Sequence, residues 1–323
     1  VLLPGRTECI EKYGRAAGDL VRRGYSVITI DWRGQGLADR ALADPLSGHV
    51  GDFAEYQEDL DAMLAEADRA GLPQPYFLLA HSMGGCIGLR ALIRGLPFRA
   101  AVFSAPMWGI TMAAWLRPVA QVVTALATPF GFAHRYAPTT GPEIYLLQSP
   151  FEGNVLTTDR EMWAYMRDQV RAAPELALAG PSIAWLGAAL RECAALAAIP
   201  APAVPAICAL GTQEKVVDVP PVHLRMAGWS NGQLDLYPGA EHEIMMEGPA
   251  VRTRFFDRAA ALFDAHRSCS DRSSALTGVF TAGQAMTPVR ADEHPEEYHA
   301  FASSLRSISA SRSSTFASKA CFS

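Results

Sequence analysis

Short apolar runs alternate with helical patterns over residues 1–106, and this alternation constrains the fold more than any other feature of the sequence. Residues 25–31 and 76–82 are two of the β-rich runs, and the segment 52–71 between them has its apolar residues on one helical face. Such alternation is typical of right-handed βαβ units. The sequence therefore predicts an α/β fold in which a mostly parallel sheet has helices on both faces.

A different kind of sequence interrupts this pattern between Met107 and about Leu190. It has helical spacing and is rich in tryptophan and methionine, and the α/β pattern resumes after it. We interpret it as a helical cap inserted into one domain. The predicted parts are the first part of the core (1–106), the cap (107–190), the second part of the core (191–267) and a disordered, Ser-rich tail (268–323).

Charge, cysteine content and glycine spacing exclude several classes of function. The formal net charge is −5 and no basic block is present, so nucleic acid is not an expected partner. The six cysteines are scattered without metal-binding spacing, which indicates reduced thiols in a cytoplasmic protein and no metal site. Gly34 and Gly36 follow a strand but lack the third glycine of a dinucleotide site, so no cofactor is expected either.

The apolar stretch 107–133 is long enough to suggest a membrane span, yet Arg117 and Pro118 lie near its middle. An arginine there costs about 2.5–3.5 kcal/mol on insertion scales, which argues against spanning. We therefore expect a cytoplasmic protein whose contact with the inner membrane is at most peripheral. The chain begins with Val1 inside an apolar strand, so we expect the natural N-terminus to lie upstream.

Ser82 stands between a strand and a helix in a way that ordinary turns do not explain. The apolar run 76–81 leads directly into it, and Gly84 and Gly85 follow at the start of a helical pattern. A strand that enters a sharp, strained turn and leaves it as a helix is the context of a nucleophile elbow, which lifts a serine Oγ above the sheet. The usual G-x-S-x-G motif is present over 80–84 with alanine in place of the first glycine. Ser82 is the predicted nucleophile, and an incidental serine in a strand-to-helix turn is the alternative.

A serine hydroxyl needs a base that accepts its proton, and the base needs an acid that orients it. In this arrangement the chain order is serine, acid, histidine. His242 follows a Pro-Gly turn after the last predicted strand and precedes the final helix, so it is the predicted base. His81 neighbours Ser82 on a strand and is expected to point to the opposite face.

The acid should follow the apolar run that ends at Gly211. Glu214 occupies the loop position there and is the preferred candidate, while Asp218, one helical turn further on, remains open as the alternative. An oxyanion hole needs the backbone N–H after the nucleophile and a second N–H from the loop after the first strand. We expect these from Met83 and Arg6.

The chain from Val1 to about Ala265 resembles the bacterial lysophospholipase and monoacylglycerol-lipase-like branch of the α/β-hydrolases. The matching stretches are "LPGRTECIEKYG", "DWRGQGLADR", "GHVGDFAEYQEDLD", "AHSMGG", "LTTDREMWAYMRD", "GPSIAWL", "GTQEKVVD" and "YPGAEHE". The resemblance implies the α/β-hydrolase fold with its cap after the sixth strand, and with the strands before Val1 missing here. It also implies Ser82, Glu214 and His242 as the catalytic triad.

The substrate implied by the resemblance is an amphiphilic acyl ester, such as a lysophospholipid or a monoacylglycerol, cleaved through an acyl-enzyme on Ser82. A peptidase with the same triad and an inactive protein that binds acyl ligands are the alternatives. Within the cap, Trp108, Trp115 and Trp163 are expected to bind the acyl chain, in a cap that touches membranes or micelles transiently. The alternative is that these aromatic residues form the core of the cap itself.

Overall fold

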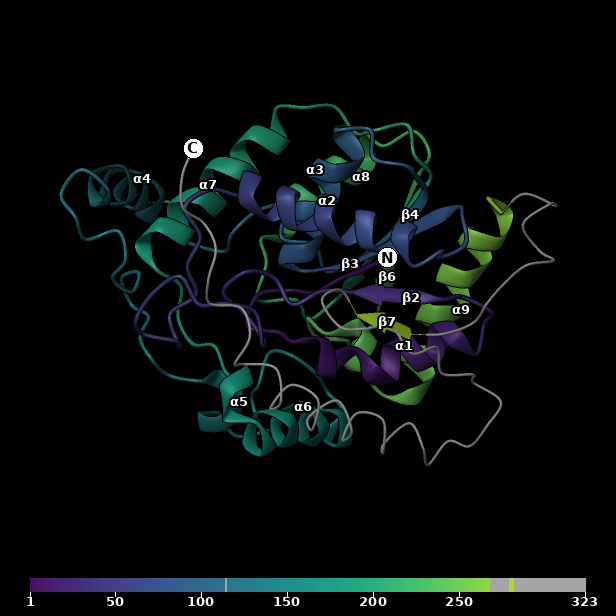
Figure 1. The fold of residues 1–323 in the computed structure, drawn as a ribbon, viewed down its shortest axis with the longest axis horizontal. Helices are drawn as coiled ribbons and strands as arrows, with labels where there is room; N and C mark the ends of the chain where they lie inside the picture. Colours follow the sequence, from purple (N-terminus) through teal and green to yellow (C-terminus); the bar gives the residue numbers. More distant parts are fainter. Residues whose placement is uncertain (114, 268–278, 282–323) are drawn as a thin grey trace, which may run out of the picture.

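A parallel sheet forms the centre of the protein, shown here by a computed structural model that describes residues 1–113, 115–267 and 279–281 (Figure 1). Its described strands follow the order β6-β5-β4-β3-β1-β2-β7, and every neighbouring pair is parallel. They are β1 (Leu2–Leu3), β2 (Val27–Thr29), β3 (Tyr76–His81), β4 (Phe98–Ser104), β5 (Ala206–Gly211), β6 (Gly232–Tyr237) and β7 (Val279–Thr281). The predicted parallel sheet is confirmed.

Helices cover both faces of this sheet (Figure 1). The helices on one face are α2 (Ala54–Arg69), α3 (Met83–Ile93) and α8 (Val219–Ala227), and those on the other are α1 (Gly14–Val21) and α9 (Pro249–Ala265). One apolar cluster joins the first three helices to the sheet, and a second joins α1 and α9 to it. Because both faces are buried at the centre of the sheet, β3 and β5 are nearly continuous apolar runs in the sequence.

The loops that carry the predicted site residues follow the carboxyl ends of the strands. The loop after β1 begins at Pro4, β3 ends at His81, β5 ends at Gly211 and β6 ends at Tyr237. Because neighbouring strands are parallel, these ends lie at one edge of the sheet, where α/β proteins form their sites. Segments from both ends of the chain therefore meet there.

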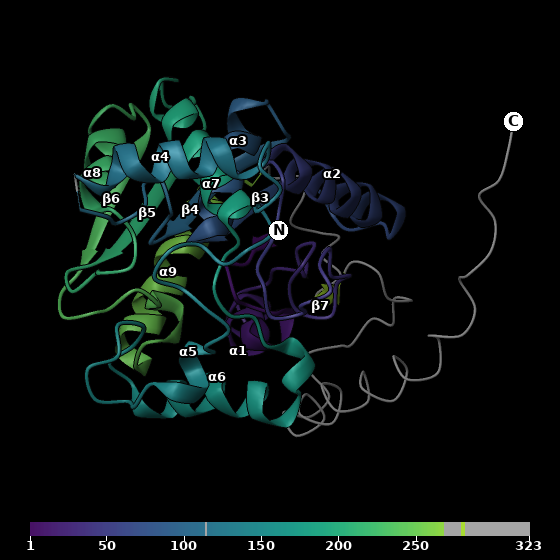
Figure 2. The ribbon, with the colours of Figure 1, turned by 90° about the vertical axis from the view of Figure 1, so that its left-hand side faces the viewer.

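The segment between β4 and β5 contains α4 (Leu116–Ala127), α5 (Tyr145–Gln148), α6 (Arg160–Ala172) and α7 (Ile183–Ala197). α4 packs against α7, which in turn contacts α3, whereas α5 packs against α6. The two pairs lie apart, the first beside α3 and the second beside α1, in both ribbon views (Figures 1 and 2). α7 continues to Ala197, past the predicted end of the cap at residue 190.

Side-chain caps begin two of these helices. Asp159 accepts a hydrogen bond from Met162 N at the start of α6, and Ser182 accepts one from Trp185 N at the start of α7. Each bond satisfies an amide group that has no partner in the first turn of its helix. α9 begins instead with Pro249 at its first position, where a missing N–H removes no helical bond.

Most of the predicted tail, 268–323, lies outside the described residues. The exception is 279–281, which forms β7 beside β2 and so differs from the prediction of disorder. Among the helices that the structure describes, none is long and apolar enough to cross a membrane.

Candidate active site

Ser82 occupies a strained turn between β3 and α3. Its φ is 49°, in a region that costs a residue other than glycine about 1–3 kcal/mol and persists only when the surroundings impose it. Ser82 N donates to Ser104 O at 3.0 Å, and Ser82 O accepts from Gly85 N and Met107 N, both at 2.8 Å. These bonds hold the serine at the end of β3 in the conformation of a nucleophile elbow.

Close packing explains the two glycines after Ser82. A Cβ on Gly84 would lie 2.3 Å from Leu3 O, and one on Gly85 would lie 2.5 Å from Pro106 Cβ. Real Cβ atoms do not approach other atoms so closely. Only glycine therefore lets α3 begin this near to β1 and to the chain after β4.

His242 and Glu214 form a buried pair at the ends of β6 and β5. His242 Nδ1 lies 2.7 Å from Glu214 Oε2, and the two side chains are 4 % and 1 % exposed. Glu214 Oε1 accepts hydrogen bonds from Val216 N (2.6 Å) and Val217 N (3.0 Å). Burial alone would raise the pKa of Glu214, but the hydrogen bond and charge of His242, together with these amides, lower it below its ordinary value. With Glu214 ionised, the Nδ1–H group of His242 donates this hydrogen bond, and in that tautomer Nε2 is the unprotonated nitrogen of the ring.

Asp218, the alternative acid, has a different partner. Its Oδ2 lies 2.7 Å from Arg117 Nη2 at the start of α4. Asp218 is also the residue before the first turn of α8. The structure thus brings Glu214 to His242 and brings Asp218 to the cap.

The loop after β1 is held by side chains from the segment after β2. Trp32 Nε1 donates to Pro4 O at 2.9 Å, and Gln35 Nε2 donates to Gly5 O at 3.0 Å. The loop adjoins the elbow because β1 pairs with β3. Both anchors lie in the Gly-rich stretch that lacks the third glycine of a dinucleotide site, and no motif in the sequence indicates that they hold this loop.

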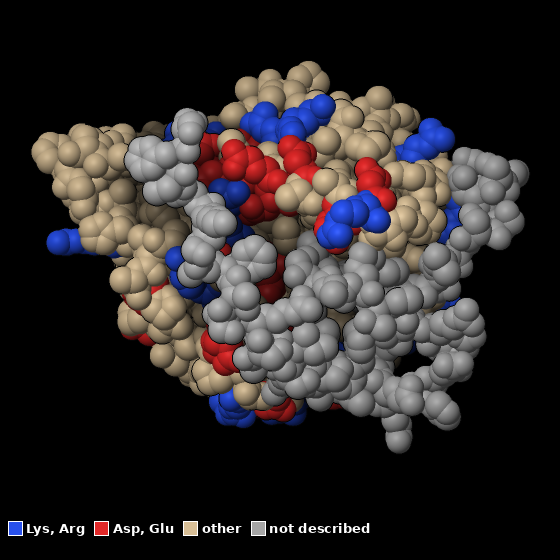
Figure 3. All heavy atoms as spheres, in the orientation of Figure 1, with Lys and Arg blue, Asp and Glu red and all other residues tan. Residues whose placement is uncertain are grey.

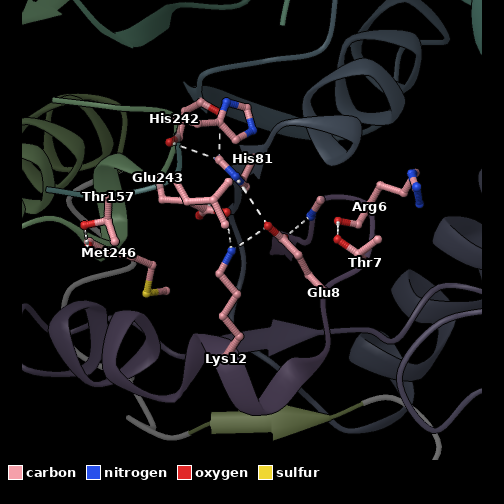
Figure 4. A network of polar contacts seen from close by, with 12 residues as sticks. Arg6, Thr7, Glu8, Lys12, His81, Thr157, His242, Glu243 and Met246 are labelled. Atoms are coloured by element: carbon pink, nitrogen blue, oxygen red, sulfur yellow. Dashed lines mark hydrogen bonds and ion pairs between the residues drawn. The ribbon is translucent and has the colours of Figure 1, made fainter. Parts of the chain in front are cut away.

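The two predicted oxyanion donors lie on either side of the contact between the loop after β1 and the turn at Ser82. Met83 is the first residue of α3, where helix N–H groups have no partner inside the helix. The Arg6 side chain points away from His242 and Glu8 (Figure 4), and its Nη1 and Nη2 atoms donate to Ala179 O at 2.8 and 2.9 Å. Burial lowers the pKa of Arg6 to about 10. The guanidinium, 5.2 Å from the centre of the Trp185 ring, ties the loop to the cap.

A cluster of buried charged residues lies beside His242 (Figure 4). Glu8, Lys12, His81 and Glu243 are 7 %, 5 %, 0 % and 3 % exposed, and the rings of His81 and His242 are 4.8 Å apart. A position on the face opposite Ser82 does not remove His81 from this cluster, because the loops after β1 and β6 bring Glu8, Glu243 and His242 to its ring. The available signal was the i,i+4 spacing of two opposite charges, Glu8 and Lys12, in a segment with helical periodicity.

The cap holds the loop that carries His242. Glu243 N donates to Leu156 O at 2.8 Å. Glu247 is 1 % exposed, and its Oε2 accepts hydrogen bonds from Thr158 N (3.0 Å) and Thr158 Oγ1 (2.6 Å). The buried Glu247 carboxylate thus fastens the chain after His242 to the cap, a role that sequence analysis did not predict.

The three tryptophans predicted to bind the acyl chain lie in different surroundings. Trp108 is 3 % exposed, and its Nε1 donates to Gly85 O in α3 at 3.1 Å. Trp163 is also 3 % exposed and packs edge-on against Tyr145. Trp108 belongs to the apolar cluster that joins α2, α3 and α8 to the sheet, and Trp163 belongs to the cluster that joins α1 and α9 to it. Trp115, at the start of α4, is 71 % exposed.

Comparison with known proteins finds relatives along most of the chain. Residues 1–249 match the protein family described as serine aminopeptidase, S33. The chain is 33 % identical over 284 residues to lysophospholipase L2 of Escherichia coli K12, a match that covers 85 % of this chain and 82 % of that protein. It is 29 % identical over 254 residues to a probable lysophospholipase L2 of Haemophilus influenzae, covering 78 % and 79 %.

The arrangement of the elements is similar to that in a solved structure of monoglyceride lipase from Saccharomyces cerevisiae, a soluble variant in complex with a substrate analog. The TM-score is 0.61, and the superposition covers 83 % of this chain and 86 % of that one. The sequence identity is 22 %. At that level of identity the likeness concerns the fold alone.

Proposed function

The chain belongs to the serine aminopeptidase S33 family, has the α/β-hydrolase fold and is a carboxylic ester hydrolase, and from this premise we propose that it cleaves lysophospholipids or monoacylglycerols through an acyl-enzyme on Ser82. The observation that carries the proposal is the buried hydrogen bond between His242 and Glu214 at the same sheet edge as a serine held in an elbow.

In the proposed reaction, Ser82 Oγ attacks the carbonyl carbon of the ester while His242 Nε2 takes its proton. Glu214 keeps the imidazole oriented and stabilises the imidazolium that forms. That imidazolium gives the proton to the leaving alcohol, and the acyl group stays on Ser82. His242 then deprotonates a water molecule that attacks the acyl carbon, and the fatty acid leaves as Ser82 regains its proton.

The oxygen of the carbonyl group becomes negatively charged in both steps. We propose that Met83 N–H and Arg6 N–H stabilise this charge, each donor contributing about 10²–10³-fold to kcat. Support comes from the position of Met83 at the start of α3 and from the anchoring of the Arg6 loop by Trp32 and Gln35. Donors fixed before the reaction need no reorganisation during it.

Glu214→Gln is expected to lower kcat about 10³–10⁴-fold, because an amide would favour the wrong tautomer of His242. Asp218→Asn is the matched control. It weakens a partly exposed ion pair with Arg117 and should leave kcat close to that of the parent. Initial rates on a short nitrophenyl ester measure both. A larger loss in Asp218→Asn would show that Asp218 orients the base.

The exposed side of α4 supports a lipid substrate. Trp115, Val119, Val122 and Phe130 are 71 %, 50 %, 58 % and 72 % exposed, and the lobe at α4 carries little charge on the face seen in Figure 3. Large apolar side chains gathered on one helix are typical of a surface that meets a partner or a lipid phase. We therefore propose that α4 touches a membrane or micelle surface transiently while the substrate enters.

A hydrolysis panel tests the substrate class, using lysophospholipids, monoacylglycerols, nitrophenyl esters of increasing length and proline-ended peptides. We expect kcat/KM on the esters to rise by up to about fourfold for each added methylene, the equivalent of about 0.8 kcal/mol, until the acyl site is full. Turnover of peptides without turnover of lipid esters would favour the peptidase alternative. A serine that no fluorophosphonate probe labels would favour the inactive acyl-binding alternative.

Two matched variants test the role of α4 in the same panel. Trp115→Ser should lower activity on long-chain lipids in micelles or vesicles while leaving acetyl-ester hydrolysis nearly unchanged. Leu224→Ser, at a residue of α8 that is 78 % exposed, should change neither activity. Equal losses on short and long esters in Trp115→Ser would indicate a folding defect and contradict a lipid-contacting role.

A further inference from the structure

We propose that Lys12 is a positioning residue: its buried ammonium group, held between Glu8 and Glu243, fixes the loop that carries Arg6 relative to the loop that carries His242. The inference rests on the proposed function, which assigns these loops to the oxyanion hole and to the general base. Lys12 acts through the two loops and takes no part in bond making or breaking.

Lys12 joins two carboxylates from opposite ends of the chain. Its Nζ lies 2.5 Å from Glu8 Oε1 and 2.6 Å from Glu243 Oε1, and the three side chains are at most 7 % exposed. Glu8 follows β1, Glu243 follows β6, and Lys12 lies in the short 3-10 helix η1 (Ile10–Tyr13). Charge-assisted hydrogen bonds this short leave little freedom in the separation of the two carboxylates. Burial alone would lower the pKa of Lys12, but the two carboxylates raise it, so the ammonium form persists.

Glu8 carries the constraint into the loop after β1. Its Oε2 accepts hydrogen bonds from Gly5 N and from Tyr13 OH. Gly5 directly precedes Arg6, whose N–H is the proposed oxyanion donor. A Cβ on Gly5 would lie 2.8 Å from the Glu8 carboxylate, so the loop passes as close to Glu8 as glycine allows.

Glu243 carries the same constraint into the loop after β6. It directly follows His242 in the chain, and its pKa is held well below the ordinary value because His81 and Lys12 outweigh the effect of burial. Figure 4 shows its carboxylate between Lys12 and the rings of His81 and His242. A displacement of Lys12 would therefore move Glu243, which lies directly beside the proposed base, His242.

His81 completes the charge balance. Its Nδ1 lies 3.0 Å from Ser104 O, an acceptor, so Nδ1 carries a proton. Its Nε2 lies 3.4 Å from Glu8 Oε1 and 3.2 Å from Glu243 Oε2. Burial alone would lower the pKa of His81, but the two carboxylates raise it. Both ring nitrogens of His81 thus face acceptor oxygens, and a protonated His81 would balance the second carboxylate of the cluster.

A metal ion would suit the spacing of this cluster, because ligand atoms of Glu8, His81 and Glu243 lie within 4.8 Å of one another. Lys12 Nζ already bridges two of these groups, and an ion would have to displace it. A buried ion cluster is often no more stabilising than apolar residues of the same size. Its distinctive consequence here is geometric: it ties two loops to one ammonium group.

Lys12→Met keeps the length of the side chain and removes its charge. We expect kcat on a short nitrophenyl ester to fall about 10- to 100-fold, because donor and base lose their fixed separation. KM should stay unchanged, since the lost interactions act in the transition state and not on the bound substrate. The rate constant for labelling by a fluorophosphonate should fall by a similar factor.

A second variant separates positioning from charge balance. Lys12→Met leaves an excess buried negative charge and is expected to lower the melting temperature. The double variant Glu8→Gln/Lys12→Met restores neutrality, because Glu243 and His81 remain as a pair. We expect its melting temperature to return toward that of the parent while kcat stays low.

Arg258→Met is the matched control, because it also leaves a buried carboxylate without its cation, at a place outside the two proposed loops. Arg258 Nε lies 2.9 Å from Asp235 Oδ2, and the Asp235 side chain is 6 % exposed in the middle of β6. This change should lower the melting temperature and leave kcat unchanged. It shows what loss of a partly buried ion pair does when neither proposed loop is involved.

Parent-like kcat in Lys12→Met, or recovery of kcat together with melting temperature in the double variant, would overturn the positioning role. In either case the parent protein would still be labelled and active. Failure of the proposed serine mechanism shows itself differently, as a parent protein that is neither labelled nor active on any ester. That result would overturn the proposed function and this inference with it.

Discussion

Ser82→Ala is expected to lower kcat for ester hydrolysis about 10⁶-fold and to abolish labelling by a fluorophosphonate probe. Without Oγ no acyl-enzyme forms, and only binding and the oxyanion donors remain to accelerate attack by water. Alanine keeps the Cβ of serine, so the strained φ of 49° is unchanged and the fold should persist. Initial rates and mass spectrometry of the labelled protein measure the two effects.

Ser230→Ala provides the control, because Ser230 is exposed and follows α8, outside the proposed site. It should label and turn over like the parent. Circular dichroism and thermal melting of Ser82→Ala should match those of the parent as well. Turnover by folded Ser82→Ala within tenfold of the parent, with contaminating hydrolases excluded, would contradict the proposed mechanism.

His242→Ala is expected to lower kcat by about the same factor, because nucleophile and base act as a unit. The sharper expectation concerns Ser82→Ala/His242→Ala, which should lose almost nothing beyond either single variant. The measurement is kcat on a short ester for the three variants, at substrate concentrations that saturate each. Losses that add in the double variant would mean that the two residues act independently.

His223→Ala is the matched control for removal of an imidazole. His223 is exposed on α8, and the change should leave kcat and labelling unchanged. If His242→Ala behaved like His223→Ala, another base would have to serve Ser82. His81 would then be examined first, since its ring lies 4.8 Å from that of His242.

Local sequence indicated the strands β1 to β6 and the turn at Ser82, but it did not indicate β7. Buried parallel strands are continuous apolar runs, which are visible without any knowledge of their neighbours. The glycines that follow Ser82 indicate that strand and helix approach closely there. The structure supplies the atoms concerned, Leu3 O for Gly84 and Pro106 Cβ for Gly85.

The sequence narrows the acid that orients His242 to two candidate residues, but it does not decide between them. Glu214 and Asp218 are carboxylates one helical turn apart, and either could follow β5. The amide of Val216 holds Glu214 in the position where it is hydrogen-bonded to His242, whereas Asp218 forms an ion pair with Arg117 of the cap. Such a choice depends on the conformation of a loop and on a residue about a hundred positions away.

The tryptophans of the cap show the same limit of local pattern. Trp108, Trp115 and Trp163 all lie in the segment 107–190, and all three are expected from the sequence to bind the acyl chain. Two are buried in the core and one is 71 % exposed. Helical spacing shows that a face is apolar, and only the packing of other elements decides what covers it.

The sequence by itself determined the kind and order of the elements, together with the predicted nucleophile and base, because periodicity, glycine spacing and chain order are local properties. Only the tertiary structure decided which buried charges meet. Lys12 is four residues from Glu8 but 231 from Glu243, and their pairing exists because β1 and β6 end at the same edge of the sheet. Charge pairing in a buried site depends on distances of a few ångströms in space, which no local pattern records.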